Sequence, residues 1–408
     1  MPMLDTESIK AQFPVFRQQT PQGQSLVYFD NAATTQKPQQ VIDAISEYYG
    51  GYASNVGRGA YWPATKATHA FQQAREKVKG FVNAASTKEI IFTAGTTDAI
   101  NKLATKWLLP DLKPGDAVVC SEMEHHGNFV PWQQACAQKG AEHRVIPISD
   151  EGELDLDAYT ALLDDKVKLV AITAVSNALG TINNLEYITR AAHEVGARVI
   201  IDAAQMVTHQ AIDVQALDCD FLCFSAHKLF GPTGIGVLYG KQALLESIPP
   251  MVYGGGMVKS VSIKQTSFAP LPARHEGGTA HIAGAIGLGA AIDFVNEIGL
   301  DQIKAHTAEL TQYALAALNK LEGIEVIGNP DQRASVISLA VGQVHPHDTA
   351  SFLAEKGIAV RAGHHCTHPL MQRLGLVGTC RVSFGIYNTK AEIDLLVEGL
   401  TEVRDFFS

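Results

Sequence analysis

Residues 198–240 read RVIIDAAQMVTHQAIDVQALDCDFLCFSAHKLFGPTGIGVLYG and contain three short apolar runs. Runs such as VIID and FLCF lack alternation of apolar and polar residues, which is typical of strands that are covered on both faces. From about residue 40 to residue 290, other short apolar runs alternate with longer helical patterns, as in parallel sheets with crossover helices. We therefore expect an α/β fold whose large part is a mainly parallel sheet with helices on both faces.

The pattern changes from about residue 290 onward. A long amphipathic helix is predicted over 302–321, followed by a strand at VISLA, a helix near 349–356 and a final strand at CRVSFGI. These elements predict a smaller α/β unit. We expect a large domain over residues 23–289 and a small domain formed by residues 1–22 and 290–408, packed tightly because no flexible linker separates them.

The composition narrows the class of protein. The chain has 408 residues, of which 46% are hydrophobic, and its formal net charge is −10. Extensive disorder is excluded, and the acidic balance argues against binding to nucleic acid or to an anionic membrane. The six cysteines are scattered without a C-x-x-C pair, and no apolar run approaches the ~18 residues of a membrane span. We expect a cytoplasmic protein with free thiols and no secretory signal.

Polar groups stand where three of the predicted strands end. Thr96 and Thr97 open a helix after Gly95, Asp202 closes one apolar run, and Lys228 follows another. Taken singly, the threonines and the aspartate are ordinary helix caps, and the lysine extends to the surface. Taken together, an amine for a carbonyl, a carboxylate and a helix N-terminus meet the three needs of pyridoxal phosphate (PLP): covalent attachment, a partner for the ring nitrogen and a phosphate site.

Several further motifs resemble one known family. These are DNAATTQKP, EHHGNFVPW, SNALGT, DAAQ, FSAHKLFGPTGIGVLYG, GGGM, RAGHHCTHPLM and YNTKAEID. The chain resembles the group II cysteine desulfurases of the SufS and CsdA type, also described as selenocysteine lyase-like. That group lies in the class V aminotransferase branch of the fold-type I PLP enzymes. The resemblance runs from about residue 15 to the C-terminus, and it implies a fold-type I PLP-dependent transferase.

The resemblance also implies roles for individual residues. Lys228 is expected to bind PLP covalently and Asp202 to pair with the ring nitrogen, while His125 stacks on the ring and moves protons. The other expected cofactor contacts are Thr96, Thr97, Asn177, Gln205, Ser225, His227 and, from the neighbouring subunit of a homodimer, Thr279. The expected substrate-binding residues are Asn177, Arg361 and Arg381, and the two arginines carry the planar set of donors that suits a carboxylate.

Cys366 lies in the segment RAGHHCTHP, whose glycine, histidines and proline suit an exposed loop. An isolated cysteine is usually a small buried apolar residue, but Arg361 and protonated histidines would favour a reactive thiolate here. A metal site of His364, His365, Cys366 and His368 is the rival interpretation; adjacent residues rarely converge on one tetrahedral ion, so we expect no metal. By resemblance, L-cysteine becomes L-alanine, and Cys366 carries a persulfide that passes to a SufE-type acceptor protein or a reductant.

Three alternatives remain open at this stage. A selenocysteine lyase or cysteine-sulfinate desulfinase would use the same cofactor with another leaving group, an aminotransferase on the same fold would need no loop thiol, and a non-catalytic or metal-binding protein would bind no PLP. The sequence also departs from the family pattern at Gly57, at Ala94 and over His275–His281. Gly57 and the last segment are expected to line the cleft, which leaves substrate preference and acceptor choice undecided.

Overall fold

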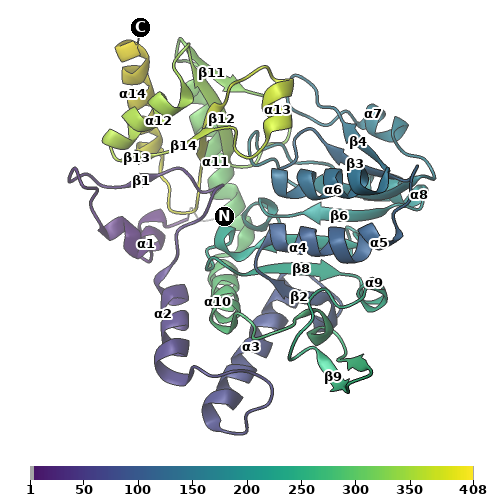
Figure 1. The fold of residues 1–408 in the computed structure, drawn as a ribbon. Coiled ribbons are helices and arrows are strands. Elements are labelled where there is room, and N and C mark those ends of the chain that lie inside the picture. Colours follow the sequence, from purple (N-terminus) through teal and green to yellow (C-terminus); the bar gives the residue numbers. More distant parts are fainter. Residues whose placement is uncertain (1–3, 408) are drawn as a thin grey trace.

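A computed structural model describes residues 4–407 (Figure 1). Its largest element is a seven-stranded sheet in the order β2-β8-β7-β6-β5-β3-β4. The strands are β2 (Ile90–Thr93), β8 (Gly236–Gly240), β7 (Phe221–Ser225), β6 (Arg198–Asp202), β5 (Val167–Thr173), β3 (Ala117–Ser121) and β4 (Glu142–Ile146). Only β8 runs antiparallel to both of its neighbours. The predicted mainly parallel sheet is confirmed.

Helices cover both faces of this sheet. Alternate strand residues point to opposite faces: in β6, Ile200 packs on the face of α4 and α6, whereas Val199 and Ile201 pack on the face of α3, α8 and α10. The helices around the sheet are α3 (Trp62–Phe81), α4 (Thr96–Leu103), α5 (Leu109–Asp111), α6 (His126–Lys139), α7 (Leu156–Ala161), α8 (Leu185–Glu194), α9 (Gln242–Ser247) and α10 (Ile282–Ile298). This two-sided burial explains why the central strands β3, β6 and β7 are mostly apolar.

A second, smaller sheet lies at the upper end of the molecule in Figure 1. Its antiparallel order is β11-β12-β15-β14. The strands are β11 (Ile324–Ile327), β12 (Val336–Val341), β15 (Thr379–Ser383) and β14 (Arg361–Gly363). The helices of this part are α11 (Leu300–Leu318), α12 (Pro346–Glu355), α13 (His368–Arg373) and α14 (Lys390–Phe407). The predicted C-terminal α/β unit is therefore present.

The N-terminal segment joins the two parts. It contains α1 (Thr6–Lys10), β1 (Val27–Tyr28) and α2 (Gln39–Glu47). Strand β1 pairs with β13 (Ile358–Ala359), and Val27 and Phe29 pack in the core of the small sheet. The division into 23–289 and 1–22 with 290–408 stays a prediction, and residues 1–3 and 408 lie outside the described part.

Some element boundaries differ from the sequence-based expectation. Helices α11 and α12 begin two and three residues before the predicted ranges 302–321 and 349–356, and Pro346 occupies the first turn of α12, where a missing N–H costs nothing. An exposed hairpin, β9 (Val258–Val261) with β10 (Thr266–Phe268), was not predicted. Between residues 4 and 407, no single helix is long and apolar enough to cross a membrane, although the bent pair α10 and α11 passes by length and composition.

Candidate active site

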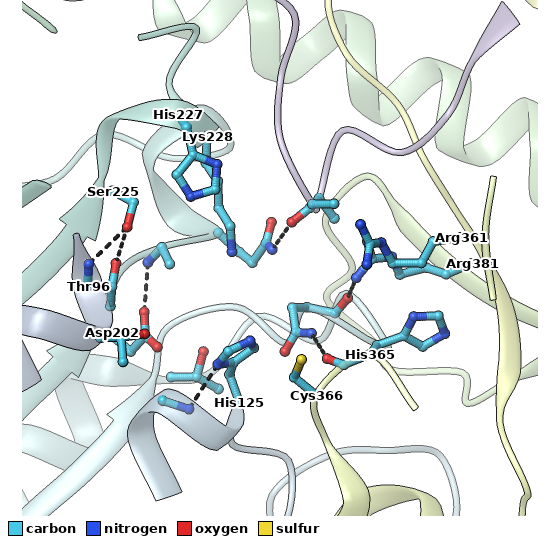
Figure 2. Close-up of a pocket in the computed structure, with 18 residues that line it drawn as sticks. Thr96, His125, Asp202, Ser225, His227, Lys228, Arg361, His365, Cys366 and Arg381 are labelled. Atoms are coloured by element: carbon cyan, nitrogen blue, oxygen red, sulfur yellow. Dashed lines mark hydrogen bonds between the residues drawn. The ribbon is translucent and has the colours of Figure 1, made fainter. Parts of the chain in front are cut away.

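One cavity of about 250 Å³ lies beyond the carboxyl ends of the central strands (Figure 2). It lies where ligands bind in open α/β sheets. The predicted site residues that line it are Thr96, Thr97, His125, Asn177, Asp202, Gln205, Ser225, His227, Lys228, Arg361, Cys366 and Arg381. In Figure 2, Thr96, Ser225 and Asp202 lie toward one end and the two arginines toward the other, with Lys228 and His125 between them.

Lys228 ends a short 3₁₀ turn that directly follows β7. Burial lowers the pKa of its amine to about 8, although the Asp202 carboxylate acts in the opposite direction. A lysine in water has a pKa near 10.4 and is almost fully protonated at neutral pH. The fold therefore gives Lys228 a much larger fraction of free amine, which is the form that attacks a carbonyl.

Asp202 is the last residue of β6 and is buried. Its Oδ1 accepts a hydrogen bond from the backbone N–H of Ala204 at 2.9 Å, and burial raises the pKa of the carboxyl group. Gln205 is held nearby, since its Nε2 donates to the carbonyl of Ala32 at 2.7 Å. A buried carboxylate on a cavity wall suits a ligand with a protonated nitrogen, because that cation would keep the carboxylate ionised.

Thr96 starts α4 beside the end of β7. Its backbone N–H donates to Ser225 Oγ at 2.9 Å, and the two hydroxyl oxygens lie 2.8 Å apart. A Cβ on Gly127 would approach Thr97 Oγ1 to 3.0 Å and His125 Nδ1 to 3.1 Å, so a side chain would crowd this end of the cavity. The helix N-terminus and the hydroxyl groups form a site that suits a phosphate.

His125 precedes α6 and caps its first turn. Its Nδ1 accepts a hydrogen bond from the backbone N–H of Gly127 at 2.9 Å, so in the neutral ring the proton is on Nε2. Burial lowers the pKa of His125 to about 4, and the charge of Lys228 acts in the same direction. His125 is therefore neutral at physiological pH and lines the cavity with one N–H donor available.

Three residues of the motif EHHGNFVPW, namely Glu124, Asn128 and Trp132, form a buried hydrogen-bond network next to His125. Glu124 accepts hydrogen bonds from Ser121 Oγ at 2.6 Å, Asn128 Nδ2 at 2.7 Å and the backbone N–H of Thr173 at 3.0 Å. Asn128 Oδ1 in turn accepts from Trp132 Nε1 at 3.0 Å. The network links the ends of β3 and β5 to α6 and so fixes the loop that carries His125.

The two predicted substrate-binding arginines share one carboxylate partner. Asp30 Oδ1 accepts from Arg381 Nη2 at 2.9 Å, and Asp30 Oδ2 accepts from Arg361 Nε at 3.1 Å. Arg381 is buried, and its Nη1 donates to the carbonyl of Asn177 at 2.9 Å, whereas its Nε has no partner within the described residues. Arg361 is exposed on the cavity wall, so its guanidinium can also donate to a second carboxylate, from a substrate.

The thiol of Cys366 projects from the connection between β14 and α13. Both His365 (φ 53°) and Cys366 (φ 59°) adopt the left-handed backbone conformation, which is costly for residues other than glycine. Two hydrogen bonds hold this shape: Asn177 Nδ2 donates to the His365 carbonyl at 2.7 Å, and the His126 N–H donates to the Cys366 carbonyl at 2.8 Å. The exposed thiol lies on the cavity wall.

The histidines around Cys366 do not converge as metal ligands would. His365 turns its Nε2 to Thr379 Oγ1 at 2.8 Å, while His364 and His126 both stack on His368. Within residues 4–407, no group of three or more His, Cys, Asp and Glu side chains is arranged to hold a metal ion. The geometry gives no support to the metal-binding alternative.

Thr279 lies apart from the other predicted residues. It lines a second cavity of about 1150 Å³ together with Gly57, Tyr61 and Glu276. In a single chain, Gly57 and most of the His275–His281 segment thus line this second cavity and not the cavity of Lys228, so the expectation that they line the cleft stays a prediction. Ala94 is exposed and donates its backbone N–H to Asp98 Oδ2 at 2.9 Å.

Sequence reasoning did not assign Asp30 or Glu124 any role, and it missed Gly127, Thr173 and Ala32 in the cavity wall. Asp30 and Ala32 belong to the quoted motif DNAATTQKP, and Glu124 and Gly127 to EHHGNFVPW. These motifs were the available signal. Thr173 ends an ordinary apolar strand, and nothing in its surroundings marks it.

The amino-acid sequence also matches a known protein family. The model described as aminotransferase class-V matches residues 27–396. The chain belongs to the aminotransferase class-V family. A probable cysteine desulfurase from Halalkalibacterium halodurans is 48% identical over 404 residues, which are 99% of each chain.

Two solved structures of cysteine desulfurases are similar over the whole class-V fold. CsdA from Escherichia coli has a TM-score of 0.91 at 38% identity and covers 99% of both chains. The apo enzyme from Thermococcus onnurineus has a TM-score of 0.94 at 36% identity and covers 100% of this chain and 99% of its own. These similarities confirm the fold-type I prediction made from the sequence.

Proposed function

We propose that this protein is a PLP-dependent cysteine desulfurase that converts L-cysteine to L-alanine and takes up the sulfur on Cys366. The observation that carries the proposal is that one cavity contains both the Lys228 amine and the Cys366 thiol. An aminotransferase has no use for the thiol, whereas sulfur removal needs a second nucleophile. The relatives named cysteine desulfurases, which match over nearly the full chain, support the same reaction.

The residues of the cavity fit PLP. Lys228 would hold its aldehyde carbon, Asp202 its ring nitrogen and Gln205 its ring hydroxyl group, with Thr96, Thr97, Ser225 and His227 around its phosphate. His125 would stack on the ring. When bound, PLP supplies an electron sink that makes the α-proton of an amino acid acidic.

The remaining chemistry belongs to the side chains of this protein. Arg381 and Arg361 orient the substrate carboxylate, and the Lys228 amine removes and returns the α-proton. The Cys366 thiolate attacks the sulfur of L-cysteine: an S–S bond forms, and the Cβ–S bond breaks with its electron pair left on the carbon fragment. Protonation of that fragment gives L-alanine, and Cys366 keeps the sulfur as a persulfide.

We further assign the protein to the group II desulfurases of the SufS and CsdA type, with a SufE-type protein as sulfur acceptor. The exposed Cys366 thiol supports transfer to another protein. Thr279 lines a different cavity from Lys228, which supports a homodimer in which it reaches the phosphate of the other subunit. Five buried free cysteines and one exposed support a reducing, cytoplasmic location.

Mass spectrometry of the PLP-loaded protein after incubation with L-cysteine tests this proposal. We expect a mass gain of one sulfur on the peptide that contains Cys366 and release of L-alanine. The variant Cys366→Ala should lose both, whereas Cys136→Ala, which removes a buried thiol remote from the cavity, should keep them. Wild-type alanine release in Cys366→Ala would refute the proposal.

The same assay separates the competing activities. Fast alanine release from selenocysteine or cysteine sulfinate, but not from cysteine, would identify a lyase or a desulfinase. Conversion of the cofactor to its amine form without any sulfur product would identify an aminotransferase.

A further inference from the structure

An unusual number of donors surrounds one carbonyl oxygen, that of His227. The backbone N–H of Thr35 lies 3.0 Å from it, Thr34 Oγ1 3.0 Å, Thr35 Oγ1 3.1 Å and Lys37 Nζ 2.9 Å. This carbonyl belongs to the peptide bond that joins His227 to Lys228. The segment 34–37, which is remote in sequence, therefore holds the backbone directly before the reactive lysine.

One of these donors is Lys37. Its half-buried amine also lies 3.3 Å from Thr34 Oγ1 and contacts the carbonyl of Thr35. With the His227 carbonyl, the Lys37 amine thus has three acceptors, and all three are neutral oxygens. Within residues 4–407, no carboxylate lies at ion-pair distance from Lys37. Three acceptors use all three N–H bonds of an ammonium group. In its protonated form, the Lys37 amine makes charge-assisted hydrogen bonds, which are roughly twice as strong as neutral ones.

The same segment also holds the chain after Lys228. Phe230, two residues further on, donates its backbone N–H to Thr35 Oγ1 at 2.8 Å. The segment itself is fixed from outside, since Tyr28 Oη donates to the carbonyl of Thr34 at 2.9 Å. Lys228 is thus clamped on both sides, and the direction of its side chain depends on this clamp.

We propose that Lys37 is a positioning residue, which fixes the His227–Lys228 peptide so that the Lys228 amine reaches the aldehyde carbon of PLP. This inference rests on the proposed function, because it assumes that Lys228 binds the cofactor. Lys37 is not among the residues that line the cavity, so it acts through the backbone of its neighbour. Burial of the Lys37 amine disfavours its charged form and lowers its pKa to about 7.

The test is the covalent capture of PLP by the full-length protein after its cofactor has been removed. At saturating PLP, the growth of the visible absorption band of the lysine-bound cofactor reports the covalent step alone. We expect Lys37→Met to slow this step by roughly tenfold or more, since small errors in the placement of a reacting group have effects of that size or larger. The visible circular dichroism per bound cofactor should also fall, because a loosely held ring has no fixed orientation.

Controls separate positioning from stability. Lys37→Arg keeps the charge and should recover part of the rate, and Lys320→Met, on an exposed lysine, should behave as the wild type. If Lys37→Met does not fold, Thr34→Val removes one donor to the same carbonyl and should slow capture in the same direction. Wild-type capture and dichroism in the variant would overturn the inference, even if its melting temperature falls. A wild-type protein that forms no visible band would overturn the proposed function itself.

Discussion

The burial of His209 has an electrostatic cost that depends on pH. His209 is buried, its Nδ1 lies 3.4 Å from Ser335 Oγ, and burial lowers its pKa to about 4. In the unfolded chain a histidine has a pKa near 6.5. Between these two values the unfolded state binds a proton that the folded state excludes. Above pH 6.5, His209 therefore imposes no penalty on the unfolding free energy, and that free energy decreases as the pH falls from 6.5 toward 4.

This difference can be measured with one variant. Between pH 7 and pH 5, we expect the free energy of unfolding of the wild type to fall by about 2 kcal/mol more than that of His209→Asn. Urea titrations of both proteins at the two pH values give the comparison, and other titrating groups cancel in the difference. Equal losses in the two proteins would mean that folding does not lower the pKa of His209, and would contradict this account.

At the scale of elements, the loop between β3 and α6 depends on Glu124. Replacement by alanine leaves the buried donors of Asn128 and Thr173 without an acceptor, and each such group costs ~1–3 kcal/mol. We expect Glu124→Ala to lose about 3 kcal/mol of unfolding free energy. Glu124→Gln should lose less, because it keeps an acceptor oxygen and the same shape. Glu151→Ala, on an exposed residue, is the control, and an equal effect of the two alanine variants in urea titrations would contradict the account.

Short-range patterns were enough to predict several elements and part of the site. The strands around Asp202 and Lys228 are recognisable because burial on both faces leaves only apolar residues in them. Both residues stand at strand ends, where ligands bind in open α/β sheets, and this rule predicts that they line a ligand site. The reversal of β8 was not predictable in this way, because a run such as GVLY looks the same in either strand direction.

Contacts between distant residues were out of reach of the sequence. Asp30 pairs with Arg361 and Arg381 across more than 300 residues, and the left-handed conformation of Cys366 depends on Asn177 and His126 from other elements. No local pattern encodes such contacts. For Thr279, only the resemblance to a known family gave a role, and in this chain alone it lies in a different cavity from Lys228.

The whole molecule has a surface that suits a second copy of the chain. Tyr61 is 60% exposed and lines the large cavity that contains Thr279, and the adjacent Trp62 is 65% exposed. Exposed aromatic side chains at the rim of a cavity are typical of protein interfaces. We therefore expect a solution mass of two chains.

The variant Trp62→Glu should shift the mass toward a single chain in analytical ultracentrifugation, because a charge would be buried without a partner. Its PLP should be lost more readily, since Thr279 of the other subunit no longer reaches the phosphate. Thr279→Ala should weaken PLP retention without a change in mass. Phe406→Glu, on an exposed residue of α14, should affect neither. A single-chain mass for the wild type would refute the dimer.

The central claim is that one amine, on Lys228, holds PLP at the end of β7. Borohydride reduction of the PLP-loaded protein fixes this bond, and peptide mapping by mass spectrometry then locates the modified residue. We predict stoichiometric modification of Lys228 and none in Lys228→Ala. A label on any other lysine, including the nearby Lys37 whose amine also has a lowered pKa, would contradict the account.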